Sequence, residues 1–140
     1  MEAGYRVLDH TADLALESFA PTPEAALAEA ARGLCAQLCD PATVAERRAV
    51  ALEARGADPE TRLVHFLQEA LAAWHLERML LARFEVEPLA GDVVRGRGFG
   101  EPFDPARHEI LGELKAVTYH QARFAHGADG LWRAFFVVDI

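Results

Sequence analysis

Positive charge is scarce in this sequence: 14 Lys and Arg side chains stand against 22 Asp and Glu side chains, which gives a formal net charge of −8 over 140 residues. Lysine occurs once, at Lys115. A surface this negative repels phosphate, so we expect no direct, high-affinity binding of nucleic acid. The same repulsion disfavours binding to an anionic membrane surface.

Long apolar runs are also missing, because no segment approaches the roughly 18 apolar residues that a membrane-spanning helix needs. Residues 1–4 carry neither the basic nor the apolar part of a secretory signal. We therefore expect a cytoplasmic protein without a membrane anchor. The two cysteines, Cys35 and Cys39, have no further Cys or His nearby at ligand spacing, which favours small buried thiols over a zinc site.

Two common catalytic motifs are absent as well. Serine occurs once, at Ser18, without a Gly-x-Ser-x-Gly motif, so nothing supports a nucleophilic serine triad. The glycines of residues 95–100 (Arg-Gly-Arg-Gly-Phe-Gly) do not follow a strand-to-helix transition, which excludes a dinucleotide-binding or phosphate-binding loop. Glycines spaced in this way within a strand predict kinks or a bulge.

The residues that are present suit one globular domain over residues 1–140, with 51% hydrophobic and 26% charged residues. Thr22 and Asp58 are helix-capping residues, and each directly precedes a proline at the first helical position. Apolar residues then recur at helical spacing as far as about residue 38 and about residue 77. The sequence therefore predicts two amphipathic helices.

The remaining pattern predicts about seven strands, at residues 5–7, 13–19, 49–54, 81–87, 93–99, 115–125 and 131–140. The last two of these ranges form a hairpin around residues 126–130 (His-Gly-Ala-Asp-Gly). Together the elements predict an α+β fold in which two helices pack on mostly antiparallel β-sheet, as one two-layer domain.

The register of that hairpin decides which residue faces Asp139. If residues 126–130 form a five-residue loop, Asp139 lies opposite Val117. A four-residue loop places Thr118 opposite Asp139 instead. In both registers the strand that runs beside the end of the chain carries four side chains able to form hydrogen bonds, namely Lys115, Thr118, Tyr119 and His120.

Two acidic positions are candidates for a metal site. Asp139 and the terminal carboxylate of Ile140 follow an apolar strand, and two adjacent carboxylates repel each other unless a cation or a proton lies between them. Oxygen-only ligands favour Mg²⁺, Ca²⁺ or Mn²⁺, although a solvated carboxylate at the edge of a sheet is the alternative. The second position is the segment from Asp9 to Asp13, which either binds a metal or caps backbone N–H groups in a loop between two strands. His10 in this segment is either a base or simply exposed.

Polar residues also gather in residues 103–109 (Phe-Asp-Pro-Ala-Arg-His-Glu) and along residues 115–120. Polar groups of this kind need hydrogen-bonding partners when they are buried. One interpretation is a polar network that holds a loop against the sheet. The other is an interaction face, or a set of residues that orient the carboxylates.

Three segments of the sequence together resemble the archease family. They are residues 9–13 (Asp-His-Thr-Ala-Asp), residues 113–120 (Glu-Leu-Lys-Ala-Val-Thr-Tyr-His) and the terminal pair Asp139-Ile140. The length of the chain, the loop at residues 104–108 and Trp132 fit the family too, so the resemblance covers essentially the whole chain.

Archeases are small accessory proteins of the GTP- and Mn²⁺-dependent RNA ligase that joins 2′,3′-cyclic-phosphate or 3′-phosphate RNA ends to 5′-hydroxyl ends. The resemblance implies that this chain is not an enzyme but promotes guanylylation and repeated turnover of such a ligase in tRNA splicing and RNA repair. It also implies a site for a divalent metal (Ca²⁺, Mg²⁺ or Mn²⁺) formed by Asp13, Asp139 and the terminal group of Ile140. Residues placed around that site or toward the partner would be Asp9, His10, Lys115, Thr118, Tyr119 and His120.

Two other functions compete with this one. A stand-alone metal-dependent phosphoesterase would use Asp13 and Asp139 for the metal and His120 as the base. The scarcity of positively charged groups that could hold a phosphate ester argues against it. A general chaperone or adaptor with a structural metal is the other alternative, and it would bind several unrelated enzymes.

Overall fold

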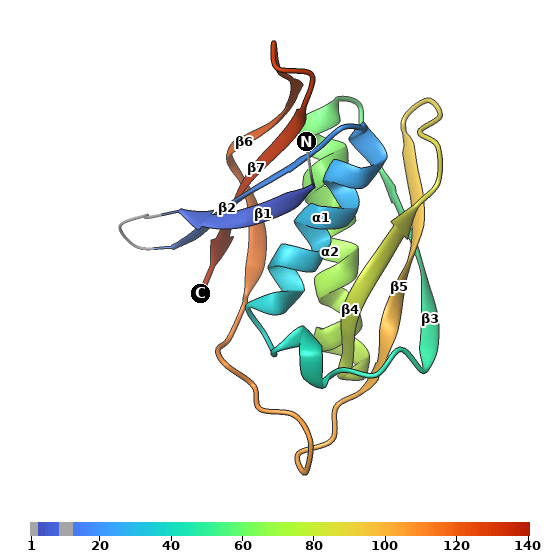
Figure 1. Ribbon diagram of the computed structural model, residues 1–140, viewed down its shortest axis with the longest axis vertical. Coiled ribbons are helices and arrows are strands. Elements are labelled where there is room, and N and C mark those ends of the chain that lie inside the picture. The colour runs from blue at the N-terminus through green and yellow to red at the C-terminus, as the bar shows by residue number, and fades with distance from the viewer. Residues whose placement is uncertain (1–2, 9–12) are drawn as a thin grey trace.

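The computed structural model describes residues 3–8 and 13–140 of the chain (Figure 1). Two α-helices lie within these residues, α1 (Pro23–Ala36) and α2 (Pro59–Glu77), together with a short 3₁₀ helix, η1 (Pro41–Thr43). The strands in the same part of the chain are β1 (Gly4–Leu8), β2 (Leu14–Ala20), β3 (Arg48–Arg55), β4 (Met79–Val86), β5 (Val93–Pro102), β6 (Ala116–His126) and β7 (Trp132–Asp139).

Both helices begin where their capping residues predict. The Thr22 hydroxyl accepts a hydrogen bond of 3.1 Å from the Ala25 N–H, and the Asp58 carboxylate accepts one of 2.8 Å from the Thr61 N–H. Each cap satisfies a backbone donor that the first helical turn leaves without a partner. The predicted helices are confirmed, and their C-terminal ends lie within two residues of the expected positions.

The strands form two antiparallel sheets. The four-stranded sheet has the order β1-β2-β7-β6, and the three-stranded sheet has the order β3-β5-β4. Helix α1 packs against β2 of one sheet and β4 of the other, and α2 packs against β6 and β3. The helices therefore lie between the two sheets, as Figure 1 shows.

This arrangement confirms the α+β class and the antiparallel sheets, but it corrects the number of layers from two to three. The reason is the composition of α1, where small and apolar residues are buried over more than one face of the helix rather than on one narrow stripe. A helix with a buried surface this wide contacts more than one neighbouring layer. The core accordingly runs through the helix layer, and its largest fully buried side chains include Leu16, Leu27, Leu34, Phe66 and Phe136.

The predicted irregularity at the glycines of β5 is also present. The pairing of β4 with β5 shifts between Leu81 and Arg83, opposite Gly100 and Phe99. A Cβ atom on Gly100 would lie 1.7 Å from the carbonyl oxygen of Leu80, so no other residue fits where the two strands approach.

Cys35 and Cys39 are buried and free, as predicted. Burial raises the pKa of the Cys35 thiol to about 12, because the thiolate would lose its hydration. Neither helix in the described part of the chain is long and apolar enough to cross a membrane.

Candidate functional site

The structure brings Asp13 and Asp139 to the same end of two neighbouring strands. The register of β2 and β7 ends with Leu14 opposite Val138, and the two aspartates are the next residue on each chain segment. Both side chains are partly buried, and neither forms an ion pair with a residue that the structure describes. Two carboxylates therefore lie at this end of the four-stranded sheet.

The other predicted residues of the first acidic segment, Asp9 and His10, lie outside the described residues and stay predictions. Ile140 follows Asp139 directly, and its residue surface is 55% exposed. Across residues 3–8 and 13–140, no three or more His, Cys, Asp and Glu side chains gather closely enough to hold a metal ion. The described part of the chain thus supplies two carboxylate side chains, Asp13 and Asp139, to a site of this kind. Carboxylate oxygens are the donors that Ca²⁺, Mg²⁺ and Mn²⁺ prefer, so the chemistry of these two side chains fits a divalent cation.

The pairing of β6 with β7 corrects both registers predicted for Asp139. Ala116, rather than Val117 or Thr118, lies opposite Asp139. His126 still belongs to β6 and pairs with Trp132, so the turn begins one residue later than expected. Farther along β6, the register shifts between Thr118 and Arg123, where four residues of β6 face one residue of β7. A strand pattern alone does not reveal a bulge of this size.

Helix α2 holds the start of β6 in place. The His75 Nε2 donates a hydrogen bond of 2.7 Å to the Leu114 carbonyl oxygen, and the Gln68 side-chain amide donates one of 3.1 Å to that of Val117. The Lys115 N–H, between these two anchors, donates a hydrogen bond of 2.8 Å to the Asp139 carbonyl oxygen. Sequence reasoning missed His75 and Gln68. Their seven-residue spacing, which places them on one face of a helix, was the available signal.

The bulge separates the predicted polar residues of β6 into two groups. Lys115 lies beside Asp139, and Thr118 pairs with Val137, two residues before Asp139. Tyr119 and His120 belong to the bulge, where Gln121 adopts a φ angle of 57°, in the left-handed region that few non-glycine residues occupy.

Tyr119 is bound to α2 rather than directed along the sheet. The His65 Nδ1 lies 2.5 Å from the Arg55 carbonyl oxygen, which only accepts hydrogen bonds, so this nitrogen carries the proton. The His65 Nε2 therefore accepts from the Tyr119 hydroxyl, at 2.6 Å. The structure thus gives Tyr119 a structural contact that its position in the sequence did not indicate.

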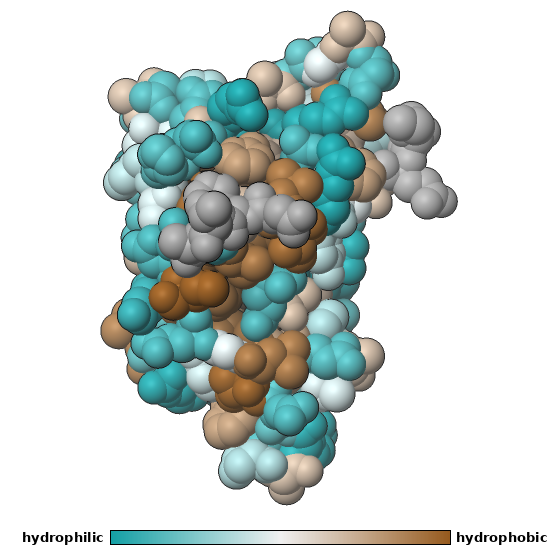
Figure 2. All heavy atoms as spheres, turned by 90° about the vertical axis from the view of Figure 1, so that its left-hand side faces the viewer, coloured by the Kyte–Doolittle hydropathy of each residue, from teal (hydrophilic) through white to brown (hydrophobic). Residues whose placement is uncertain are grey.

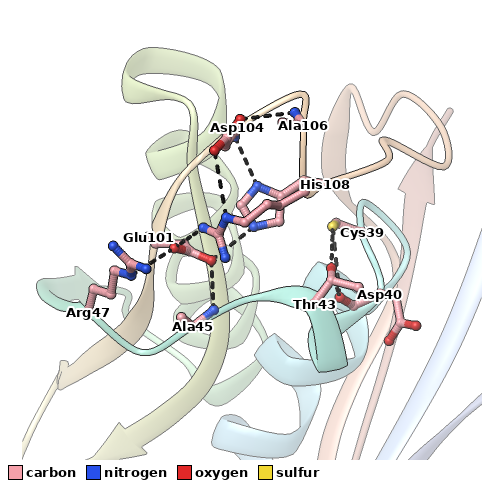
Figure 3. Close-up of polar contacts among 10 residues, drawn as sticks. Cys39, Asp40, Thr43, Ala45, Arg47, Glu101, Asp104, Ala106 and His108 are labelled. Atoms are coloured by element: carbon pink, nitrogen blue, oxygen red, sulfur yellow. Dashed lines mark hydrogen bonds and ion pairs between the residues drawn. The ribbon is translucent and has the colours of Figure 1, made fainter.

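A second polar cluster lies around Glu101, at the end of β5 (Figure 3). Its carboxylate is almost completely buried and accepts from the Ala45 N–H at 2.7 Å and from the His108 Nε2 at 2.9 Å. The Arg107 guanidinium binds the other carboxylate oxygen, and the Nε of Arg47 lies 3.3 Å from the same oxygen. The contacts of residues 104–108 match the interpretation of this segment as a network that holds a loop against the sheet.

The Glu101 network has a defined protonation pattern. The Asp104 N–H donates to the His108 Nδ1 at 2.9 Å, so the His108 proton lies on Nε2 and is donated to Glu101. The Ala45 N–H, with help from Arg107 and His108, lowers the pKa of the Glu101 carboxyl to about 2. Glu101 is therefore ionised at neutral pH.

Comparisons with known proteins identify the family. The model of the Archease protein family (MTH1598/TM1083) matches residues 5–140. The chain belongs to the archease family. A protein archease of Methanopyrus kandleri is 40% identical over 136 residues, which cover 95% of this chain and 96% of the relative. A protein archease of Pyrococcus furiosus is 33% identical over 135 residues, which cover 94% and 95%.

A further archease relative and a solved structure also match. A protein archease of Ictalurus punctatus is 35% identical over 119 residues, which cover 82% of this chain and 73% of the relative. The solution structure of Methanobacterium thermoautotrophicum protein 1598 matches with a TM-score of 0.84 and 26% identity over 98% of this chain and 99% of that one. The archease resemblance predicted from the sequence motifs is thereby confirmed, and so is the predicted fold class.

Proposed function

We propose that this archease-family chain is a non-catalytic activator of a GTP- and Mn²⁺-dependent RNA ligase. It would promote guanylylation of the ligase and its repeated turnover in tRNA splicing and RNA repair, in the cytoplasm. The observation that carries the proposal is the position of Asp13 and Asp139 at adjacent strand ends, without an ion-pair partner in the described part of the chain. These are the two side chains that the family resemblance implies for the metal.

In this proposal Asp13, Asp139 and the carboxyl group of Ile140 hold one divalent cation, either Ca²⁺, Mg²⁺ or Mn²⁺. A cation held here would neutralise phosphate charge near the nucleotide of the ligase. The chain itself fixes Asp139 through the N–H of Lys115 and, behind it, through His75 of α2. Asp9, His10 and Thr118 would lie near this site or toward the partner.

The surroundings of the two carboxylates suit a protein partner. Figure 2 shows apolar side chains gathered on the side of the molecule that carries the four-stranded sheet. Val7 of β1 and Ile140 after β7 are 50% and 55% exposed. Exposed apolar side chains on the same side as acidic ones that have no ion pair among the described residues favour a protein interface with a basic rim, where opposite charges would also speed association.

Several contacts disfavour the alternative of a stand-alone phosphoesterase. His120, its candidate base, lies in the bulge of β6 and not opposite Asp139. The hydroxyl of Ser18 is buried and donates a hydrogen bond of 2.7 Å to the Ala26 carbonyl oxygen. The raised pKa of Cys35 leaves its thiol protonated and unreactive at neutral pH.

The deciding experiment measures multiple turnover of the ligase with GTP, with and without this protein. We expect Asp13→Asn and Asp139→Asn to lose the stimulation, and Asp92→Asn, an exposed acid that pairs with Arg55, to keep it. Full stimulation by both site variants would overturn the proposed metal site. Metal-dependent release of phosphate by the protein alone would favour the phosphoesterase. Stimulation of several unrelated enzymes would favour the chaperone.

A further inference from the structure

A cleft of about 440 Å³ opens where the start of β3 and the end of β5 meet the loop that follows β5. Three arginines line it, Arg47, Arg48 and Arg107, and Glu101 and Phe103 lie in its wall. Three guanidinium groups therefore line one cleft of a chain whose net charge is −8. The archease metal site proposed above uses none of these residues.

The buried carboxylate of Glu101 positions two of the three arginines. It binds Arg107 and Arg47 through one oxygen, while the Ala45 N–H and His108 occupy the other (Figure 3). The carboxylate is thus saturated with donors and cannot turn away from the guanidinium groups. Because Glu101 is fixed by the fold, the two arginines are oriented before any ligand arrives.

Much of the donor capacity of these arginines is unused. The Arg47 side chain is 68% exposed and approaches Glu101 only through Nε. Arg48 lines the cleft and forms no ion pair with any residue that the structure describes. Each guanidinium has five N–H donors, so most of the donors of Arg47 and Arg48 are available to a ligand.

The charges around the cleft differ from those on other surfaces of the molecule. Elsewhere an arginine often faces a single carboxylate of its own, as Arg6 faces Glu17 and Arg133 faces Asp129. The lining of the cleft contains three arginines and the two carboxylates of Glu101 and Asp104, so the lining carries one positive charge in excess. A small anion bound in the cleft would neutralise this excess positive charge.

We propose that this cleft binds the phosphate group of one nucleotide, with Arg47, Arg48 and Arg107 as the phosphate ligands. The partly buried ring of Phe103 would pack against the base, since aromatic rings stack on bases of any sequence. A volume of about 440 Å³ is within the usual size of small-molecule sites. A single phosphate group fits better than an extended strand, because the negative surface beyond the cleft repels a longer polyanion.

The phosphate has two chemical sources, a free nucleotide or the phosphorylated end of an RNA. A titration of the full chain, followed by the backbone amide signals in NMR spectra, distinguishes them. The probes are inorganic phosphate, guanosine 5′-monophosphate, guanosine, and one short RNA with either a 3′-phosphate or a 3′-hydroxyl end. We expect inorganic phosphate and the two probes with a terminal phosphate group to shift the amides of Arg47, Arg48 and Phe103. Guanosine and the 3′-hydroxyl RNA, whose only phosphates are backbone diesters, should leave these amides unchanged.

The matched variants are Arg48→Glu and Arg123→Glu. Both residues are exposed on strands, neither forms an ion pair in the described part of the chain, and both changes alter the net charge equally. Arg48→Glu should weaken binding of guanosine 5′-monophosphate by about tenfold or more, since a charge-assisted contact is replaced by repulsion. Arg123→Glu should change it less than about twofold.

Several results would overturn the proposal. They are the absence of shifts with every phosphate-bearing probe, equal binding of guanosine and its monophosphate, shifts confined to another surface, or equal weakening by the two variants. Stronger shifts with 3′-phosphate RNA than with the free nucleotide would identify the RNA end as the source, and the reverse would identify the nucleotide. Because the titration contains no ligase, it is independent of the proposed activator function.

Discussion

The main-chain N–H of Lys115 and the carbonyl oxygen of Asp139 form a hydrogen bond of 2.8 Å, one residue before β6 begins. This bond adds a main-chain contact at the last residue of β7, which already pairs with Ala116. It connects the motif at residues 113–120 with the main chain of Asp139, whose side chain belongs to the proposed metal site. A change that loosens the start of β6 should therefore reach Asp139 as well.

His75 provides the first test of that connection. His75→Ala removes the donor to the Leu114 carbonyl oxygen. Leu114 itself is only 3% exposed, whereas His75 is exposed. We expect the free energy of unfolding to fall by about 1–2 kcal/mol, because a partly buried acceptor loses its partner. Denaturation by urea measures the loss. Leu76→Ala is the control, since Leu76 is 82% exposed and should change stability by less than about 0.5 kcal/mol. Equal losses in the two variants would show that the His75 bond does not stabilise the start of β6.

A residue added after Ile140 tests the third proposed metal ligand. The extension converts the carboxylate of Ile140 into an amide, which removes one negative charge from the proposed site. We expect the affinity for Ca²⁺ and Mn²⁺, measured by calorimetry, to fall by about tenfold or more, because a charged ligand is lost. The same extension before Met1 should be tolerated. Equal affinities of the two extended proteins would remove Ile140 from the site.

Local rules predicted most of the elements. The capping residues Thr22 and Asp58 define the starts of α1 and α2, because each cap is a hydrogen bond between residues that are close in the sequence. The arrangement in three layers could not be predicted from the sequence. The alanines of α1 pack equally well on one sheet or between two, and only the division of the strands into two sheets decides which.

The candidate site was predictable in its acids but not in their surroundings. Asp13 and Asp139 were identified from the sequence, yet the residue opposite Asp139 was wrong in both predicted registers. The bulge between Thr118 and Arg123 shifts that register, and within it Tyr119 contacts His65, 54 residues away in the sequence. The ion-pair network of Glu101 likewise joins β5 to the segment before β3, so sequence spacing does not reveal it.

The lowered pKa of the Glu101 carboxyl predicts that the free energy of unfolding depends on pH in the acid range. Its pKa is about 2 in the folded protein, against an ordinary value of 4.5. A lowered folded pKa means that its contribution to stability is fully present above about pH 4.5 and is lost as the pH falls toward 2. The free energy of unfolding of the wild type should therefore fall more steeply across this window than that of Glu101→Gln.

Asp129 provides the comparison for Glu101. The exposed guanidinium of Arg133 lowers the pKa of Asp129 to about 2 as well. Salt screens exposed charges and leaves buried ones largely unaffected. Each variant is compared with the wild type by how steeply the free energy of unfolding falls in acid. In about 0.5 M salt we expect the difference for Asp129→Asn to become smaller and the difference for Glu101→Gln to persist. A flat difference between wild type and Glu101→Gln from pH 5 to 2 would contradict the assigned pKa.

The hydrogen bond between Tyr119 and His65 is tested by a double-mutant cycle. Tyr119→Phe removes only the hydroxyl, and His65→Ala removes the acceptor together with the donor to the Arg55 carbonyl oxygen. We expect each change to lower the free energy of unfolding by about 0.5–1.5 kcal/mol, and the double variant to lose less than the sum. The difference between the sum and the double variant is the coupling energy, expected at about 0.5–1 kcal/mol.

Variants of Tyr119 also test whether the bulge takes part in the proposed function. If the contact with His65 only stabilises the bulge, Tyr119→Phe should leave stimulation of the ligase unchanged at temperatures where the protein stays folded. If the exposed ring of Tyr119 also touches the ligase, Tyr119→Ala should lower stimulation well beyond Tyr119→Phe, because 58% of the residue surface is available to a partner. A coupling energy near zero would show that the bulge is held by its backbone alone, and the hydroxyl of Tyr119 would then contribute nothing to the fold.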